Sequence, residues 1–433
     1  MENQDPTTST DNIAVAVNPK LQQLRDAILS GNIPQMVLNI ISYALDLRSS
    51  DIHIEPETYT VRLRYRIDGV MRQIVEYPLN IHPAVISRIK IMSNLKIDEQ
   101  RIPQDGRCEV TTKDNREMDL RVSTLPTVNG EKVVMRIQDK SRKIPDLPEL
   151  GLDEHNFNLL KEALELPNGI LLTTGPTGSG KTTTLYSCLN RLNDVSVNIL
   201  TIEDPVEIQM DGLNQSQVHA DINYTFANGL RTALRQDPDI IMVGEIRDKE
   251  TIQTAIEASL TGHLVLSTIH TNSAIETLTR IDNLGVQPFL MASTIEMIIA
   301  QRLVRRLCNN CKIPYSPDEM MKERINIAIK NIGVPDLIPA DLIAKQEFWK
   351  ESEHGCSECD GIGYKGRVGL YEVMRMDNEI RKMILNKASS IEIEKTAMKS
   401  GMVTLEQAGI IKALAGVTTL EEIYRVAKKM EVD

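Results

Sequence analysis

Aromatic residues are scarce in this sequence of 433 residues, at 3% of the total with a single Trp. Basic residues do not dominate either, since 49 Lys and Arg stand against 60 Asp and Glu, giving a formal net charge of −11. Proteins that hold nucleic-acid strands use basic grooves and aromatic stacking platforms. We therefore expect no direct nucleic-acid partner.

The sequence also lacks any apolar run of the roughly 18 residues that a membrane-spanning helix needs. Residues 1–12 are polar and acidic, without the basic and apolar segments of a secretory signal. These absences predict a cytoplasmic protein with no membrane span. What the sequence does contain is a balanced globular composition, 41% hydrophobic and 25% charged, which is typical of folded soluble domains.

The length favours two or three domains. Residues 1–18 look like a flexible tail, and residues 19–140 combine helical spacing with alternating strands, which predicts a small α+β domain. Prolines in residues 141–150 predict a linker. In residues 151–433, short apolar runs alternate with helical segments, which predicts an α/β domain with a largely parallel sheet. Helical spacing continues over residues 377–433 and predicts a helical C-terminal region.

A glycine-rich segment, GPTGSGKT, follows an apolar run and precedes a helix-compatible stretch. This matches the P-loop pattern in its required strand, loop and helix context, and a glycine-rich turn without a ligand is the alternative. Lys181 would neutralise phosphate oxygens, and Thr182 would ligate Mg²⁺. The candidate nucleotide ligands are Gly175, Pro176, Thr177, Gly178, Ser179, Gly180, Lys181, Thr182 and Thr183.

The segment RQDPDIIMVGE contains a short apolar run that ends in Glu245. We predict a buried strand beside the P-loop strand, which would deliver Glu245 to the γ-phosphate as the base for the attacking water. Taken alone, the pattern also fits an ordinary strand and turn.

Three further candidates stand at the ends of other apolar runs. Glu203, in TIEDPVE, would face the ligand edge of an open α/β sheet and could assist through Mg²⁺ or the nucleophile; an acidic loop is the alternative. His263 and His270 stand on either side of a short strand in TGHLVLSTIH, where we expect them near the γ-phosphate. Structural histidines at strand ends are the alternative.

Four of the six cysteines form two CxxC pairs, Cys308 with Cys311 and Cys356 with Cys359. Each pair can supply two thiolates to a tetrahedral Zn²⁺. We predict a structural zinc module over residues 306–362, with disulfides or free thiols as the alternatives. Cysteine usage of this kind points to a reducing compartment.

The ordered series GPTGSGKTTT, TIEDPVE, RQDPDIIMVGEIRD and TGHLVLSTIHTN resembles the Walker A, Asp box, Walker B and His box of the secretion ATPase superfamily. The segments SSDIHIEP and RYRIDG resemble that family's N-terminal domain. The resemblance implies a RecA-like core, a homohexamer that binds ATP and Mg²⁺, and mechanical work driven by hydrolysis. It also implies that two arginines of the N-terminal domain, Arg121 and Arg136, and two of the core, Arg231 and Arg235, clamp the phosphates. Judged by spacing alone, these arginines would be surface ion-pair residues, although Arg231 and Arg235 would share one helix face.

The four-cysteine insert resembles that of the family members that assemble pili or drive type II secretion, and differs from the shorter retraction ATPases. We therefore expect a cytoplasmic motor that docks on an inner-membrane platform protein. A pilus retraction ATPase, a nucleic-acid translocase or DNA-uptake motor, and a scaffold that senses ATP without hydrolysis are the alternatives. Family members often carry an additional N-terminal domain, whereas only a short segment precedes Ser50 here, so docking through that segment or through the core surface is expected.

Overall fold

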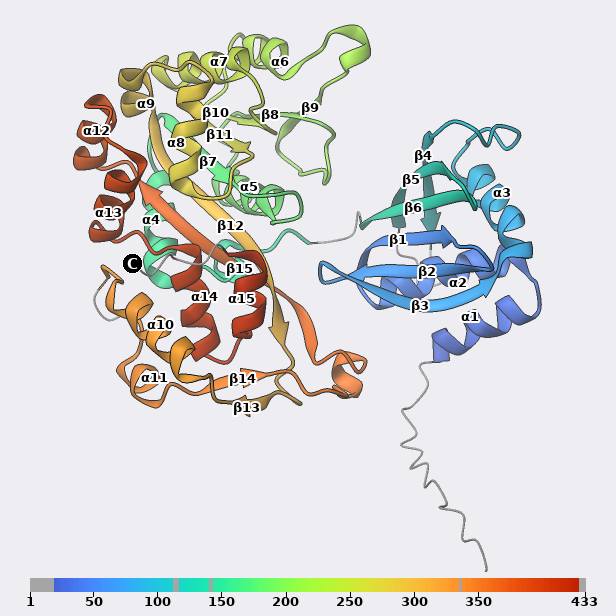
Figure 1. The fold of residues 1–433 in the computed structure, drawn as a ribbon. Helices are drawn as coiled ribbons and strands as arrows, with labels where there is room; N and C mark the ends of the chain where they lie inside the picture. Colours follow the sequence, from blue (N-terminus) through green and yellow to red (C-terminus); the bar gives the residue numbers. More distant parts are fainter. Residues whose placement is uncertain (1–18, 112–116, 140–142, 335–336, 428–433) are drawn as a thin grey trace, which may run out of the picture. The chain divides into compact units, whose positions relative to one another are not determined.

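The computed structural model describes residues 19–111, 117–139, 143–334 and 337–427. The predicted tail, residues 1–18, lies outside the described residues. The chain divides between Ser141 and Arg142 into two compact units, which are described separately (Figure 1). Among the described helices, none is long and apolar enough to cross a membrane.

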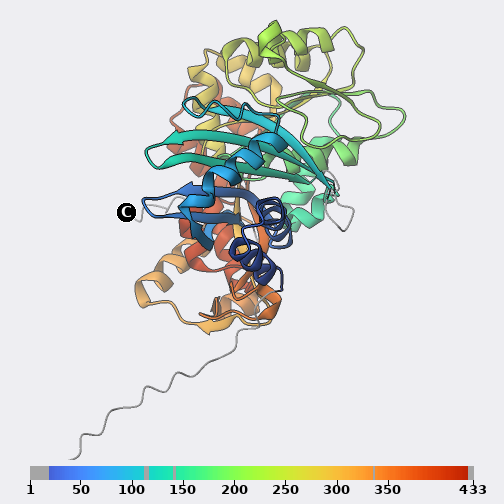
Figure 2. The same ribbon diagram turned by 90° about the vertical axis from the view of Figure 1, so that its right-hand side faces the viewer.

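The first unit is a six-stranded antiparallel sheet with the order β3-β2-β1-β6-β5-β4 and helices packed on one face. Helices α1 and α2, dark blue, lie side by side in both views (Figures 1 and 2). The elements are α1 (Pro19–Leu29), α2 (Ile33–Asp46), β1 (Ser49–Pro56), β2 (Thr60–Ile67), β3 (Val70–Pro78), η1 (Leu79–Ile81), α3 (His82–Met92), β4 (Gln104–Thr111), β5 (Glu117–Thr127) and β6 (Gly130–Asp139).

Alternation along β2 explains which face of this sheet forms the core. Val61, Leu63 and Tyr65 are buried, and the arginines between them are partly exposed. The Tyr65 hydroxyl donates to the Ile40 carbonyl of α2 at 2.6 Å. The apolar face therefore packs on the helices, and the opposite face of the sheet carries the charges.

The second unit is a seven-stranded sheet with the order β15-β12-β7-β11-β10-β8-β9. Every neighbouring pair is parallel except β12 with β15, so the prediction of a largely parallel α/β sheet is confirmed. The elements that build and cover it are η2 (Leu147–Leu150), α4 (Glu154–Leu164), β7 (Gly169–Thr174), α5 (Lys181–Leu192), β8 (Ile199–Glu203), β9 (Asn214–Gln217), η3 (Ala220–Ile222), α6 (Phe226–Ala233), β10 (Ile240–Val243), α7 (Lys249–Leu260), β11 (Leu264–Ile269), α8 (Ala274–Asn283), α9 (Pro288–Thr294), β12 (Ile295–Leu307) and β15 (Tyr364–Arg375).

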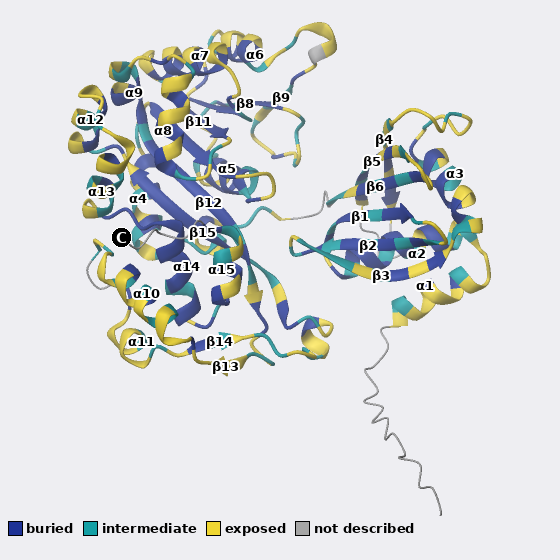
Figure 3. Ribbon diagram, viewed as in Figure 1, coloured by how far each residue is buried: buried dark blue, intermediate teal, exposed yellow. Residues whose placement is uncertain are grey.

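Both faces of this sheet are covered. Leu172 and Val243 belong to one hydrophobic cluster, which also contains Ile252 of α7. Their strand neighbours Leu171 and Met242 belong to a second cluster on the other face, with residues of α5. Because successive strand residues point to opposite faces, the short apolar runs of the sequence correspond to strands buried on both sides. Figure 3 shows these central strands in dark blue.

Two parts of the second unit extend beyond this sheet. The cysteine-containing insert between β12 and β15 forms β13 (Ile313–Tyr315), α10 (Glu319–Lys330), α11 (Ala340–Lys345), β14 (Phe348–Lys350) and η4 (Ser357–Cys359). The C-terminal helices are α12 (Asn378–Leu385), α13 (Ser390–Lys399), α14 (Leu405–Leu414) and α15 (Leu420–Val426). At the other end of the unit, part of the predicted linker is structured, because η2 places Leu147 in the core.

Candidate nucleotide-binding and catalytic site

The glycine-rich loop joins β7 to α5, which is the context that the sequence predicted. A Cβ atom at Gly175, where φ is +147°, would lie 2.6 Å from the Gln301 carbonyl oxygen. Gly180 caps the first turn of α5 in the left-handed region, at φ +92°. Glycine is required at both positions, and the loop backbone closes around the helix N-terminus, where backbone N–H groups favour phosphate.

Lys181 is buried at the first position of α5, and its Nζ donates to the Gly175 carbonyl at 2.7 Å and the Pro176 carbonyl at 3.2 Å. Burial lowers the pKa of Lys181 to about 8; Glu245 opposes this shift, and Arg302 adds to it. An anion bound next to this desolvated ammonium group would stabilise its charged form. This is the electrostatic character of a phosphate site.

Two residues of β12 lie next to the loop, and sequence reasoning missed both. The Gln301 side chain donates to the Ser179 carbonyl at 2.8 Å. Arg302 approaches the loop as well, since a Cβ at Gly175 would lie 3.1 Å from its Nη1. Both contacts join segments far apart in the sequence, and only the pairing of β12 with β7 brings them together.

Glu245 follows β10, and the sheet order corrects one expectation about this strand. β10 does not lie beside the P-loop strand, because β11 is inserted between β10 and β7. Glu245 nevertheless reaches the same edge of the sheet, since all three strands are parallel. The Thr268 hydroxyl of β11 donates to the Gly244 carbonyl at 2.8 Å and fixes the residue before Glu245.

The carboxylate of Glu245 is half-buried and has two partners. His270 Nε2 lies 3.1 Å from its Oε2, and Arg247 forms an ion pair with its Oε1. His270 follows β11 at the ligand edge of the sheet. The structure therefore brings together Glu245 and His270, two residues that the sequence predicted separately.

The expectation that His263 also lies near the γ-phosphate is wrong. His263 precedes β11, and its carbonyl accepts from the backbone N–H of Gly169 at the start of β7. Its Nδ1 lies 2.8 Å from the Ala258 carbonyl, at the end of α7. Because parallel strands share their amino ends, His263 stands at the edge of the sheet opposite Lys181. Its ring contacts the end of α7, and its carbonyl contacts the start of β7.

Glu203 ends β8 and is buried, with its carboxylate already bonded within the unit. It accepts from the hydroxyls of Tyr186 at 2.5 Å and Thr201 at 2.6 Å, and from the Gln215 amide at 3.1 Å. Tyr186 lies in the second turn of α5, the helix that begins at the P-loop. Sequence reasoning missed this contact, because helical spacing does not say which strand end a side chain meets. Glu203 thus links the P-loop helix to β8.

Of the two core arginines, Arg231 lies in the last turn of α6 and Arg235 follows the helix. Arg231 is exposed and pairs with Glu250. The helix ends at Ala233, before Asp237 and Pro238, so Arg235 does not share its face as expected. Arg235 instead donates back to the Arg231 carbonyl at 3.0 Å.

In the first unit, three arginines stand directly opposite one another on adjacent strands: Arg107, Arg121 and Arg136. Asp51, on the next strand, accepts from Arg136 Nε at 3.0 Å. These residues line a cavity of about 530 Å³. Sequence reasoning missed Arg107, because its opposition to Arg121 is a property of strand register. Like charges at directly opposed positions repel one another, and a nearby anion reduces that repulsion.

The four paired cysteines converge, with all sulfurs within 4.8 Å of one another. The Sγ atoms of Cys308 and Cys356 are 3.7 Å apart, and those of Cys311 and Cys359 are 3.8 Å apart. Sulfurs at about 2.3 Å from a tetrahedral Zn²⁺ are separated by about 3.8 Å, so this donor set fits the ion, whereas disulfides require about 2 Å. The backbone N–H groups of Cys356 and Gly363 donate to the Cys359 sulfur.

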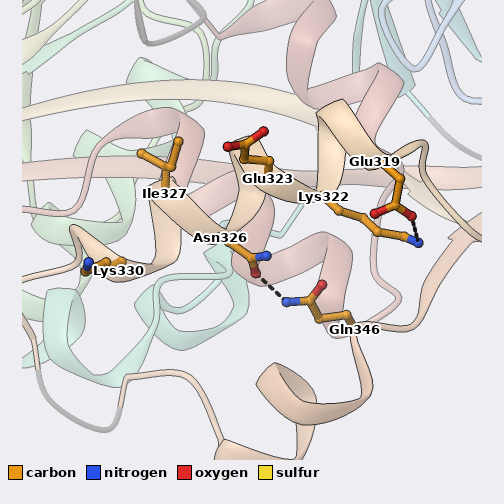
Figure 4. A pocket seen from close by; sticks show the side chains of 7 residues that line it. All are labelled: Glu319, Lys322, Glu323, Asn326, Ile327, Lys330 and Gln346. Atoms are coloured by element: carbon orange, nitrogen blue, oxygen red, sulfur yellow. Dashed lines mark hydrogen bonds and ion pairs between the residues drawn. The ribbon is translucent and has the colours of Figure 1, made fainter. Parts of the chain in front are cut away.

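A separate pocket of about 430 Å³ lies in the insert, on α10 (Figure 4). Two pairs of its polar side chains interact: Lys322 with Glu319 at 2.8 Å, and Gln346 with Asn326 at 2.5 Å. None of its lining residues belongs to the P-loop or to the Glu245 and His270 pair. It plays no part in the nucleotide site described above.

A largely parallel sheet with a glycine-rich loop on a helix N-terminus and a carboxylate at the same edge of the sheet, one strand further along, defines a P-loop nucleoside triphosphatase of the RecA-like class. The family model described as type II/IV secretion system protein matches residues 27–425, and the chain belongs to that family.

Relatives within the family share close to half of the aligned residues. The chain is 46% identical over 403 residues to the type IV pilus assembly ATPase PilB of Myxococcus xanthus, covering 93% of this chain and 69% of the relative. It is 45% identical over 411 residues to the type II secretion system protein E of Pseudomonas aeruginosa, covering 95% and 78%. The crystal structure of the pilus retraction motor PilT with bound ADP is similar in fold, with a TM-score of 0.57 and 26% identity over 90% of this chain and 96% of that one.

Proposed function

We propose that this protein is a motor ATPase that couples ATP hydrolysis to type IV pilus assembly or type II secretion. The observation that carries the proposal is the meeting of Lys181, Glu245 and His270 at one edge of a parallel sheet. ATP hydrolysis needs a phosphate cradle and a group that orients or deprotonates water, and this edge offers both.

Within the cradle, the backbone of residues 175–183 and Lys181 hold the phosphates, and the Thr182 hydroxyl is a ligand to Mg²⁺. Glu245 acts as the base, with His270 holding its carboxylate. Glu203 assists from the neighbouring strand, where its three donors keep it at the ligand edge. The bound cation would neutralise phosphate charge as the bond breaks.

The four arginines Arg121, Arg136, Arg231 and Arg235 contact phosphate oxygens during turnover. Support comes from the opposed pair Arg121 and Arg136, whose repulsion a phosphate anion would relieve. Arg121→Gln and Arg136→Gln should each lower kcat while ATP binding at the P-loop persists. An unchanged kcat in both variants would remove these two residues from the site.

The four cysteines hold one Zn²⁺ with a structural role. A closed set of four thiolates leaves no open coordination position for catalysis. The ion would join the end of β12 to the segment that leads into β15 and stabilise the insert between them.

The driven machine assembles pilins or pseudopilins. Relatives named for pilus assembly and type II secretion are 46% and 45% identical, whereas the retraction motor is 26% identical. This difference, together with the four-cysteine insert, favours assembly or secretion over retraction. The working form is a homohexamer in the cytoplasm, docked on an inner-membrane platform protein.

The test is ATP hydrolysis by the purified protein at known oligomeric state, with and without double-stranded DNA, and against Lys181→Ala. We expect Mg²⁺-dependent turnover by a hexamer that DNA does not change and that the variant loses. Strong DNA stimulation with a steep salt dependence would instead indicate a translocase. Absence of turnover in the wild type would leave a scaffold that senses ATP.

A further inference from the structure

Arg302 is a buried cation on β12, the strand next to the P-loop strand, with a relative exposure of 7%. Among the described residues, its side-chain hydrogen bonds all go to neutral oxygens. Nη2 donates to the Asn272 carbonyl at 3.0 Å and to its side-chain Oδ1 at 3.2 Å. Nη1 donates to the Gln301 carbonyl at 3.1 Å, and Nε donates to the Val426 carbonyl at 3.2 Å. Within the described ranges, no carboxylate forms an ion pair with it.

Burying a guanidinium without a carboxylate partner lowers the stability of the folded protein, so a functional reason for Arg302 is worth seeking. Burial lowers the pKa of Arg302, and Glu372 and Glu276 partly offset this. Arg305, on the same strand, shows the ordinary alternative: it pairs with the Glu422 carboxylate at 2.8 Å. Arg302 therefore differs from Arg305, because it donates to backbone and amide oxygens, those of Asn272 and Val426 in other segments and that of Gln301 in its own strand.

The main segment that Arg302 holds is the loop after β11, which carries His270. Thr271 is tied to the end of the P-loop strand, because its backbone N–H donates to Thr174 Oγ1 at 2.9 Å. Asn272, the next residue, is tied to Arg302 by two bonds. The loop is thus fixed at two consecutive residues, immediately after the histidine that contacts Glu245.

We propose that Arg302 is a positioning residue for ATP hydrolysis: it anchors Asn272 so that His270 stays on the Glu245 carboxylate. The proposal rests on the function proposed above. Arg302 acts through the loop and touches neither water nor the phosphate in this role. Because misplacement of a catalytic group by about 1 Å can cost about 100-fold in rate, loss of this anchor should affect the chemical step.

The first measurement is steady-state hydrolysis by Arg302→Met, a neutral change of similar size. We expect kcat to fall about 10-fold or more, with KM for MgATP changed by less than about threefold, since the cradle itself is retained. Arg302→Lys keeps the charge but loses the planar guanidinium, whose Nη2 bonds both oxygens of Asn272. It should recover part of kcat.

A double-mutant cycle with His270→Ala separates positioning from a general loss of structure. If Arg302 acts through His270, Arg302→Met will lower kcat by a much smaller factor in the His270→Ala background than in the wild type. Arg305→Met is the matched control, because it removes an arginine from the same strand and breaks a buried pair. It should lower the melting temperature and combine with His270→Ala without coupling.

Independent, multiplying effects of Arg302→Met and His270→Ala on kcat would overturn the proposal, as would an unchanged kcat. If Arg302→Met does not fold, the same cycle is run with Arg302→Lys, and the same two outcomes decide it. Failure of the underlying function is distinguishable, because it would appear as absent turnover in the wild-type protein.

Discussion

His270 Nε2 lies 3.1 Å from Glu245 Oε2, and the two residues follow neighbouring parallel strands, β11 and β10. This contact joins the two strand ends across the ligand edge of the sheet. One carboxylate oxygen is held by His270 and the other by Arg247. The Glu245 carboxylate is therefore already oriented before nucleotide binds.

Glu245→Gln should retain ATP binding and lose turnover, because the amide keeps the shape of the side chain but cannot accept a proton. A general base contributes about 100-fold to 10,000-fold in rate, so kcat should fall within that range while the Kd for ATP changes little. Single-turnover hydrolysis and nucleotide titration measure the two quantities. Glu257→Gln, at an exposed position on α7, is the control and should behave as the wild type. Wild-type turnover in Glu245→Gln would assign the base elsewhere.

Nucleotide binding should take up a proton at alkaline pH. Burial lowers the pKa of Lys181 to about 8 in the free protein, and an adjacent phosphate anion would raise it again. At pH 8.5 roughly half a proton or more should enter per site, and at pH 7 almost none, because Lys181 is already charged there. Calorimetric titration with ADP in buffers of different ionisation enthalpy measures this uptake. Equal proton uptake at both pH values would contradict the assignment.

Removal of zinc should unfold the insert. Cys311→Ser leaves three thiolates, so the zinc content should fall from one per chain toward zero, and proteolysis should reach the segment between Cys308 and Cys359. Structural zinc contributes about 10 kcal/mol or more of apparent binding energy, so the melting temperature should fall as well. The control is Cys108→Ser, a change in the first unit, and this variant should keep one zinc per chain. Full zinc content in Cys311→Ser would show that the four sulfurs are not the ligands.

Glu372 should make stability depend on pH. This fully buried carboxyl on β15 accepts from the backbone N–H groups of Ala274 at 2.7 Å and Leu405 at 3.3 Å, and burial raises its pKa to about 7. The folded state then holds the proton more tightly than the unfolded state, whose pKa is about 4.3. Ionising Glu372 in the folded state therefore lowers the free energy of unfolding. This loss of stability is absent below about pH 4.3, grows as pH rises to 7, and is complete above pH 7.

Glu372→Gln carries no titrating group and should lack this dependence. The free energy of unfolding of the variant minus that of the wild type should increase from pH 5 to pH 8 by up to about 3 kcal/mol, which means that the variant becomes relatively more stable. Chemical denaturation at the two pH values measures the change. Glu379→Gln, exposed on α12, should show no such trend. A constant difference between Glu372→Gln and the wild type would contradict the raised pKa.

Features that depend on local chemistry could be predicted from the amino-acid sequence alone. GPTGSGKT needs glycine for its backbone and Lys181 for charge, and its flanking residues place the loop between a strand and a helix. The CxxC spacing likewise identified all four thiols that converge. Apolar residues and arginines alternate in the sequence of β2, and this matches its buried and exposed faces, because side chains on a strand alternate between its two faces.

Contacts between distant segments depend on the tertiary structure. In the sheet, β11 lies between the P-loop strand and β10. Because of the direction of β11, His263 lies at the opposite edge of the sheet, whereas His270 contacts Glu245. The pairing of β12 with β7 places Gln301 and Arg302 next to the P-loop. The register of β4 and β5 places Arg107 opposite Arg121. Periodicity describes which face a residue lies on, whereas the neighbour across that face is set by packing of the whole sheet.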